Sequence, residues 1–290
     1  MTKVKFIHDI GLWSIYRLWL GFKMYSPSNI TYVTDNSYDI VFSWVCGHPS
    51  YLPDEFEQVL SNKIRAYYVE SLNTDYLEWI RPTDILFTYD IKLKELLHDT
   101  YNIHLMFHGF DDTHFTISNR SKRIYTIATT GWNNYDRVSQ INHCVASNGG
   151  YHLALGMTIP VIKEQCDNNI NLNYIKLCYY HPSTDTSKLA QVLNKCWYVS
   201  GITEVRGIER LICEGLACGA KPIVFDRDML RYWFYDCVEY VSEDKCLFEK
   251  QLTTLLQQKP KISKKHINFI KHNYSFKVIV PSVYSIIKKY

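Results

Sequence analysis

The stretch RGIERLICEGLACGAKPIVFD, residues 206–226, is the part of the chain that decides the fold. Its pattern predicts a helix with two carboxylates, Glu209 and Glu214, followed by a small-residue turn and a buried strand. The two glutamates are five positions apart, which is about 500° around a helix at about 100° per residue. Both can therefore reach one ligand only at the start of the helix, where backbone N–H groups are free.

Small residues at the end of this helix favour close packing on a sheet. Gly215 and Gly219 lie in that part of the stretch. A helix start beside an acid can bind a phosphate at one point and sugar hydroxyls at another. The stretch therefore predicts a site for a nucleotide-sugar.

The same stretch resembles the C-terminal signature of GT-B glycosyltransferases, close to the retaining family 4 group. That signature has a glutamate, a Gly-aromatic-Gly turn and a second glutamate eight residues after the first. Aligned without gaps, Glu214 matches the second glutamate and Gly207 the first glycine, while Arg206 and Glu209 replace the first glutamate and the second glycine. The resulting Arg-x-x-Glu-x4-Glu variant is similar to that of phage DNA α-glucosyltransferases, although other family members share it.

A second match to this superfamily lies upstream. Residues 83–90 predict a strand, a helix follows through Leu96, and residues 108–115 read HGFDDTHF. The superfamily has an Asn-Gly-Val-Asp-x-x-x-Phe element at the end of its N-terminal domain. Here His108 replaces the asparagine, and the other three positions fit: Gly109, Asp111 and Phe115. The two matches together cover residues 83–275.

The resemblance implies an α/β protein of GT-B architecture, with two Rossmann-like domains whose parallel sheets face each other across a cleft. It also implies a hexosyl- or pentosyltransferase that uses a nucleotide-sugar, with a UDP-sugar as the first choice. The transfer would retain the anomeric configuration of the sugar and would need no metal or other cofactor. The acceptor would be a saccharide or glycoconjugate, or a hydroxymethylated base in viral DNA. A catalytically degenerate protein that only binds a sugar or a partner is the alternative.

Composition fits an intracellular enzyme with a substantial core. The 290 residues are 47% hydrophobic and 15% aromatic, with a net charge of +3 that is compatible with an anionic donor or with nucleic acid. The number of cysteines, nine, is odd, and the sequence has no Cys-x-x-Cys motif. We therefore expect reduced thiols in a cytoplasmic protein and no metal site. There is no run of 18 apolar residues and no apolar signal sequence after Met1, so no membrane span is expected.

Strand and helix patterns alternate along the chain, which favours parallel sheets with crossover helices. We expect an N-terminal domain over residues 1–117, a linker at 118–122, a nucleotide-sugar domain over 123–271 and a tail, 272–290, that returns to the first domain. The expected strands are 4–8, 30–34, 40–45, 66–70, 85–89, 104–107, 124–129, 159–162, 174–180, 197–200 and 223–225. The expected helices, besides the one in the opening stretch, are 14–24, 76–81, 92–100, 136–147, 187–193 and 280–289.

Glu214 is the leading candidate for binding ribose hydroxyls, because a carboxylate accepts two strong hydrogen bonds. Apolar neighbours on its helix predict that it is half buried. By the resemblance, Glu209 and Arg206 would meet the donor sugar and its phosphates, and Gly207 and Ile208 would line the donor. Arg206 could instead pair with Glu209, and Arg210 could bind the donor or face solvent.

The residues after the strand at 124–129 are candidates for the diphosphate. Relatives place an arginine and a lysine there as a clamp, and neither is at the expected place in this chain. The hydroxyls of Thr129 and Thr130 and the backbone of Gly131 could donate hydrogen bonds instead. The missing charge could come from one of three arginines: Arg137, Arg206 or Arg227.

Loops that follow strands of the first domain are candidates for the acceptor side. Asp9 and Gly11 follow the first strand, and Gly11 permits close backbone approach to a ligand. No Gly-x-Gly-x-x-Gly is present, so a dinucleotide cofactor is not expected. His48 follows the strand at 40–45, where it could touch the transferred sugar or have no role.

The triplet Asp226-Arg227-Asp228 looks like the Asp-x-Asp that holds Mn²⁺ in the other large glycosyltransferase fold. It follows the signature helix and its strand, which is the wrong context for that role. We expect Asp226 to end the strand and the next backbone amides to face the donor.

Overall fold

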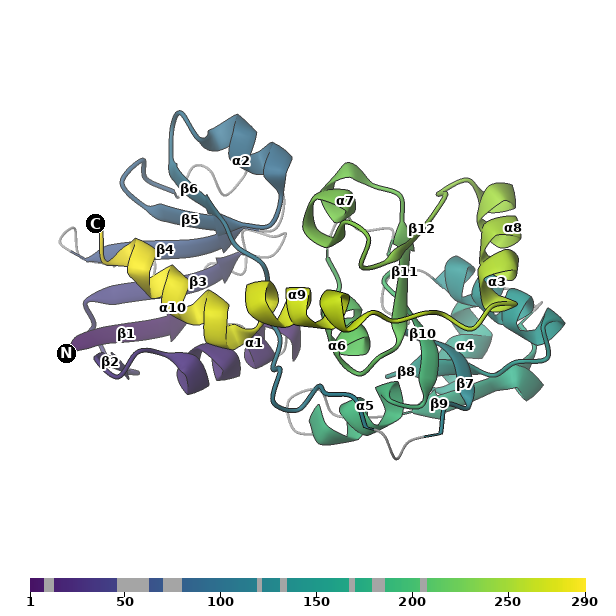
Figure 1. Ribbon diagram of the computed structural model, residues 1–290. Helices are drawn as coiled ribbons and strands as arrows, with labels where there is room; N and C mark the ends of the chain where they lie inside the picture. Colours follow the sequence, from purple (N-terminus) through teal and green to yellow (C-terminus); the bar gives the residue numbers. More distant parts are fainter. Residues whose placement is uncertain are drawn as a thin grey trace. The chain divides into compact units, whose positions relative to one another are not determined.

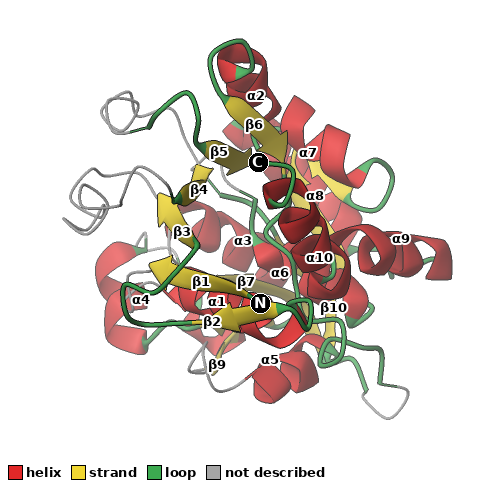
Figure 2. Ribbon diagram, turned by 90° about the vertical axis from the view of Figure 1, so that its left-hand side faces the viewer, coloured by secondary structure: helices red, strands yellow, loops and turns green. Residues whose placement is uncertain are grey.

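The computed structural model describes residues 1–7, 13–45, 63–69, 80–118, 122–130, 135–166, 170–178, 186–203 and 208–290. The chain forms two compact units. Unit 1 comprises residues 1–110 and 273–290, so it contains both chain ends, and unit 2 comprises residues 111–272 (Figures 1 and 2). Among the described residues, no helix combines the length and apolar composition that a bilayer span requires.

Unit 1 is built on a six-stranded sheet in which each described pairing is parallel, in the order β2-β1-β3-β4-β5-β6. Its strands are β1 (Thr2–Ile7), β2 (Ile30–Tyr32), β3 (Ile40–Val45), β4 (Ile64–Val69), β5 (Ile85–Thr88) and β6 (Asn102–Leu105). Its helices are α1 (Trp13–Tyr25), α2 (Ile91–Leu97) and α10 (Phe276–Ile287).

The central strands β4 and β5 are buried on both faces, as is usual for a parallel sheet with helices on both sides. Phe42 and Phe87 stack on one face at 5.9 Å between ring centroids, beneath α1 and α10, which lie side by side (Figure 1). Val41 and Leu86, one position earlier in the same strands, point to the other face and pack with Leu93 of α2. The predicted strands of this half and its helices at 14–24 and 92–100 are therefore confirmed, with ends shifted by at most three residues. The predicted helix at 76–81 lies mostly outside the described residues.

Unit 2 is built on a second six-stranded sheet with parallel pairings, in the order β12-β11-β10-β7-β8-β9. Its strands are β7 (Tyr125–Thr130), β8 (His152–Leu155), β9 (Ile175–Cys178), β10 (Cys196–Ser200), β11 (Lys221–Phe225) and β12 (Glu239–Val241). Its helices are α3 (Tyr135–Ser147), α4 (Ile159–Gln165), η4 (Leu172–Tyr174), α5 (Thr186–Leu193), α6 (Arg210–Ala217), α7 (Asp228–Phe234), α8 (Lys245–Leu256) and α9 (Lys264–Tyr274), whose last two residues belong to unit 1.

One predicted strand of this half is wrong. Residues 159–162 begin helix α4, with Pro160 in its first turn, where the missing N–H of proline costs nothing. The strand lies earlier, at His152–Leu155, and all four of its residues are buried. The last helix also begins earlier than the expected residue 280, at Phe276.

The upstream motif, residues 108–115, lies where unit 1 ends and unit 2 begins along the chain. Gly109 has φ of +77°, and a Cβ there would lie 2.5 Å from the Phe276 ring, so only glycine fits. Asp111 accepts hydrogen bonds from the backbone N–H of Thr113 at 3.0 Å and from its hydroxyl at 2.5 Å. Phe115 is fully buried.

Candidate functional site

The sheet of unit 2 has the strand order of a doubly wound nucleotide-binding domain. From β7 the chain proceeds outward through β8 and β9, and then returns to add β10 beside β7. Ligands of such sheets bind outside the carboxyl ends of the two strands at this reversal. Thr130 ends β7, and Ser200 ends β10 and leads toward α6. The described start of the stretch at residues 206–226 therefore lies where the topology predicts a ligand.

Three of the predicted site residues come together at this point. The hydroxyl of Thr130 donates a hydrogen bond to Oε2 of Glu209 at 2.9 Å. Glu209 is partly buried and is the N-cap residue of α6, but its side chain makes no cap hydrogen bond because it turns toward β7. Glu214, in the second turn of α6, is near enough for its charge to act on Glu209.

The protonation of Glu209 is set by these surroundings. Burial raises the pKa of the Glu209 carboxyl to about 7, the hydrogen bond from Thr130 offsets part of that rise, and the negative charge of Glu214 adds to it. Near neutral pH the side chain can thus either accept or donate a hydrogen bond to a ligand, which an ordinary glutamate cannot do.

Helix α6 is held against the sheet by close packing. A Cβ on Gly215 would lie 2.4 Å from Cγ2 of Val199 in β10, so a larger residue cannot occupy this position without displacing the helix. Leu211, Ile212 and Leu216 are buried around it. The packing fixes the position of Glu214 relative to the carboxyl ends of β7 and β10.

Two details differ from the sequence-based picture. The helix begins at Arg210, so Glu209 precedes the helix instead of lying on it. Glu214 is only 2% exposed, whereas half burial was predicted. The reason is that Gly215 lets α6 approach the sheet so closely that this face of the helix is enclosed.

The two threonines of β7 have different roles because neighbouring residues of a strand point to opposite faces. The hydroxyl of Thr129 is hydrogen-bonded to Nε2 of His152 in β8 at 2.8 Å, inside the unit. Burial lowers the pKa of His152 to about 3, which keeps its imidazole neutral. Thr129 is therefore a structural residue, and of the two only Thr130 contacts the carboxylate site.

Two of the arginines considered for the diphosphate are engaged within unit 2. Arg137 is buried over the rings of Phe225 and Phe248, at 5.2 and 4.9 Å, and donates to the backbone oxygen of Glu243 at 2.6 Å. Arg227 pairs with the carboxylate of Glu243 at 2.6 Å. Arg137 thus supports the packing of α3 on the sheet, and Arg227 is the N-cap residue of α7, two strands away from Thr130.

The remaining predicted residues are placed only in part. Ile208 is buried just before α6, and Arg210 is its first residue. The other six lie outside the described residues: Arg206, Gly207, Gly131, Asp9, Gly11 and His48. Asp9 and Gly11 follow β1, and His48 follows β3. These are the two strands between which the order of unit 1 reverses.

Asp226 follows β11, which ends at Phe225, and both of its carboxylate oxygens are engaged by Arg231. Asp228 is the first residue of α7. The first carboxylate is thus committed to an ion pair.

Sequence reasoning missed two residues at the same sheet edge. Glu243, which fixes both Arg137 and Arg227, follows β12, a strand that was not predicted. Gly156 follows β8 with φ of +69°, next to the strand of Thr130, and has open space where a Cβ would lie. A glycine directly after a strand was its only signal, and β8 itself was not predicted.

Comparison with known proteins supports this description of the fold. HepE from Anabaena, solved with UDP and glucose, matches with a TM-score of 0.75 at 8% identity over 100% of both chains. The chain has the GT-B fold. A glycosyltransferase from Rickettsia africae matches with a TM-score of 0.65 at 12% identity, over 99% of this chain and 98% of that one.

A third solved structure, AviGT4, a glycosyltransferase involved in avilamycin A biosynthesis, matches with a TM-score of 0.67 at 10% identity, over 100% and 97% of the two chains. No protein-family model matches the sequence, and no curated protein matches it. The fold predicted from residues 83–275 is thus confirmed, while the individual site residues stay predictions.

Proposed function

We propose that this protein is a glycosyltransferase that moves a sugar from a nucleotide-sugar, a UDP-sugar in the first instance, to an acceptor hydroxyl. The observation that carries the proposal is the group formed by Thr130, Glu209 and Glu214 at the strand reversal of unit 2. The comparison with HepE supports the choice of donor, because that protein of the same fold was solved with UDP and glucose.

In this proposal the nucleotide lies on unit 2, with Glu214 at the ribose hydroxyls. Glu209 would contact the donor sugar or its phosphates, and its pKa of about 7 lets a neutral carboxyl lie beside an anion without repulsion. As the bond to the diphosphate breaks, negative charge grows on the leaving group. Arg206, Arg210 and the backbone N–H groups at the start of α6 would stabilise that charge without a metal.

We further propose that the transfer retains configuration at the sugar, in line with the family 4 resemblance of residues 206–226. The acceptor is a saccharide or glycoconjugate, or a hydroxymethylated base in DNA. A base inside a duplex would have to be flipped out before its hydroxyl could react. Asp9, Gly11 and His48 are the candidates for the acceptor side.

Ligand-induced stabilisation tests the donor site directly. The melting temperature is measured with UDP-, GDP-, ADP- and dTDP-sugars, because binding to the native state raises it by mass action. We expect a rise with UDP-sugars that Glu214→Ala abolishes and Glu214→Gln weakens. The matched control is Glu164→Ala, which removes an exposed glutamate from α4 of the same unit and should leave the rise unchanged. No rise with any donor would refute the proposal.

Catalysis is tested separately by following donor hydrolysis or transfer, with the anomeric configuration of the product read by NMR. A second candidate function, sugar or partner binding without catalysis, is favoured by one observation. Arg137 and Arg227 are held by Glu243, so they do not replace the clamp that relatives use. A rise in melting temperature without any turnover across donors and acceptors would select this second function.

A further inference from the structure

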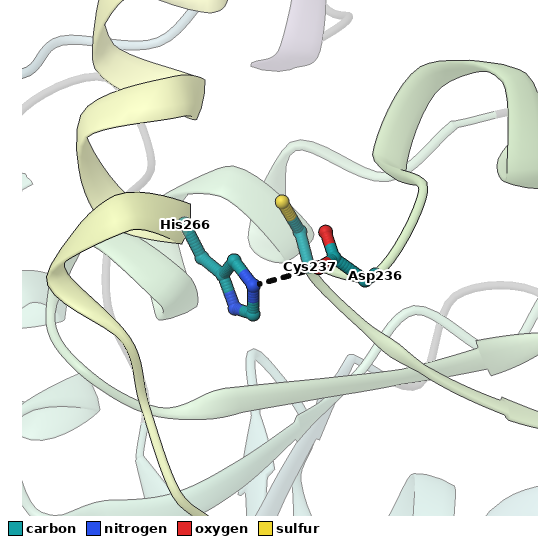
Figure 3. A group of neighbouring side chains, drawn as sticks. All are labelled: Asp236, Cys237 and His266. Carbon is teal, nitrogen blue, oxygen red and sulfur yellow. Dashed lines mark ion pairs between the residues drawn. The ribbon is translucent and has the colours of Figure 1, made fainter.

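Three side chains of types that can bind metal ions lie close together at the amino edge of the unit 2 sheet, opposite the carboxyl edge that holds Thr130 and Glu209. Asp236 and Cys237 lie in the turn between α7 and β12, and His266 lies in the first turn of α9 (Figure 3). A carboxylate oxygen, a thiol sulfur and a ring nitrogen come within 4.8 Å of one another. Cys237 is buried, the His266 side chain is 15% exposed, and the Asp236 side chain is 69% exposed. The group is thus enclosed on one side and open to solvent on the other.

The spacing of the group fits a small tetrahedral ion. Nε2 of His266 and Oδ2 of Asp236 are 3.3 Å apart. Bond lengths of about 2.0 Å to nitrogen and oxygen and about 2.3 Å to sulfur predict separations around tetrahedral Zn²⁺ of about 3.3 Å between nitrogen and oxygen and about 3.5 Å from either to sulfur. The nitrogen and oxygen already have this separation, and the Cys237 sulfur lies within 4.8 Å of a ring nitrogen of His266 and a carboxylate oxygen of Asp236.

The backbone next to the group is strained. Tyr235, directly before Asp236, has φ of 47° and ψ of −117°, a costly conformation for an aromatic residue. Its carbonyl accepts a hydrogen bond from the hydroxyl of Tyr240 at 2.7 Å. Strained backbone of this kind is concentrated at functional sites.

We propose that Asp236, Cys237 and His266 bind Zn²⁺, with water as a fourth ligand on the solvent side. Thiolate and imidazole select zinc over Mg²⁺, Ca²⁺ and Mn²⁺, which prefer oxygen ligands. The negative charges of one thiolate and one carboxylate neutralise the ion. The nearby Lys221 ammonium is itself engaged, 3.3 Å from the backbone oxygen of Asp236 and 3.5 Å from the carboxylate of Glu239.

The place of this group assigns the ion a structural role. Asp236 and Cys237 precede β12, so they lie at the amino edge of the parallel sheet, whereas Thr130 and Glu209 lie at its carboxyl edge. The ion would fasten α9, through His266, to the turn before β12. The proposal does not depend on the glycosyltransferase proposal, since neither edge uses the ligands of the other.

Titration of the metal-free protein with Co²⁺ tests the site, because Co²⁺ replaces zinc and gives a near-ultraviolet charge-transfer band when a thiolate binds it. We expect a band that saturates at one equivalent and is displaced by Zn²⁺. Cys237→Ser should abolish it, and His266→Gln should weaken Co²⁺ affinity by at least tenfold. The controls are Cys246→Ser, which changes an exposed thiol, and His272→Gln, which changes an exposed histidine of α9. Neither should affect the band.

Stability gives a second measurement that does not depend on the variants. Zn²⁺ at about a hundredfold excess over its dissociation constant should raise the melting temperature by several degrees, whereas Mg²⁺ and Mn²⁺ should not. Absence of a thiolate band in the wild-type protein would overturn the proposal and leave only the His266–Asp236 ion pair. A band that persists in Cys237→Ser, or disappears in Cys246→Ser, would overturn it as well.

Discussion

The two edges of the unit 2 sheet carry different chemistry. At the carboxyl edge, Thr130, Glu209 and Glu214 present only oxygen atoms, and one of the carboxyls titrates near pH 7. At the amino edge, one oxygen, one sulfur and one nitrogen are grouped by Asp236, Cys237 and His266. The first set suits the hydroxyls of a nucleotide-sugar and the second suits a soft divalent cation.

Strand direction explains why the two edges differ. Helices that follow parallel strands begin at the carboxyl edge and end at the amino edge, as α7 does between β11 and β12. Helix starts carry partial positive charge and helix ends partial negative charge. The first edge therefore favours anions such as a diphosphate, and the second favours cations. The same sheet can thus hold a substrate at one edge and a structural ion at the other.

The largest effect that we expect concerns Glu209 and pH. Its folded-state pKa of about 7 lies above the ordinary value of 4.5, so the folded protein binds the proton more tightly and its stability falls as pH rises between these values. The shift corresponds to at most about 3 kcal/mol. Glu209→Gln keeps an oxygen for the Thr130 hydroxyl and carries no charge. It should therefore be more stable than wild type at pH 8 and similar at pH 4.

Urea unfolding of both proteins between pH 4 and pH 8 measures this difference. Parallel stability curves for the two proteins would show that Glu209 is not buried with a perturbed pKa. The carboxyl edge would then have no carboxyl group that titrates near pH 7. Glu164→Gln, at an exposed position, is the control that should follow the wild-type curve.

The next effect concerns the packing that positions Glu214. Gly215→Ala places a methyl group 2.4 Å from Val199, and overpacking of this kind costs about 1–3 kcal/mol. We expect lower stability and weaker donor binding, because α6 has to move away from β10. The double variant Gly215→Ala/Val199→Ala provides room for the methyl group and should recover part of both. Donor binding that is unchanged in Gly215→Ala would mean that α6 does not hold the donor.

A smaller effect is expected at Arg206, which precedes Ile208, the first described residue of this segment, by two positions in the sequence. Arg206→Ala should lower turnover at least about tenfold, equivalent to about 1.4 kcal/mol of transition-state stabilisation, with little change in melting temperature. Arg206→Lys should recover little, since a point charge does not reproduce the planar guanidinium. Full turnover in Arg206→Ala together with loss in Arg137→Ala or Arg227→Ala would place the diphosphate contact elsewhere.

The smallest expected effect on turnover is that of chelation. EDTA, used well below the melting temperature, should leave the initial rate unchanged, because the proposed donor site at the carboxyl edge uses no metal. The same treatment should lower the melting temperature, because it removes the ion proposed for Cys237 and His266. Turnover that is lost with EDTA and restored by Mn²⁺ would contradict the separation of the two edges.

Most of the fold could be predicted because strand and helix patterns are local. The helix and strand of residues 206–226 and the alternation that gives two parallel sheets are encoded by neighbouring residues. The failures are local as well. Four apolar-rich residues at 159–162 fit either a strand or the first turn of α4, and β8 is buried along its whole length, so it shows no alternation.

The candidate site could be predicted only in its residue types. Sequence alone pointed to Glu209 and Glu214, because acids near a helix start suit a nucleotide-sugar, and to Thr130, because it follows the first predicted strand of the second domain. It could not show that Glu209 turns to Thr130, 79 positions away, or that Glu214 is almost fully enclosed. Those facts follow from the close approach of α6 to β10, which local sequence does not describe.

The sequence by itself thus determined most of the elements, their order and the carboxylates, because these depend on residues near each other in the chain. Only the tertiary structure decided which distant residues meet. The spacing of Cys237 and His266 resembles no zinc motif, and the sequence indicated no metal. The two residues meet because the parallel sheet sets the turn before β12 beside the first turn of α9. Such a contact is specified by the packing of whole elements and leaves no pattern in the residues around either partner.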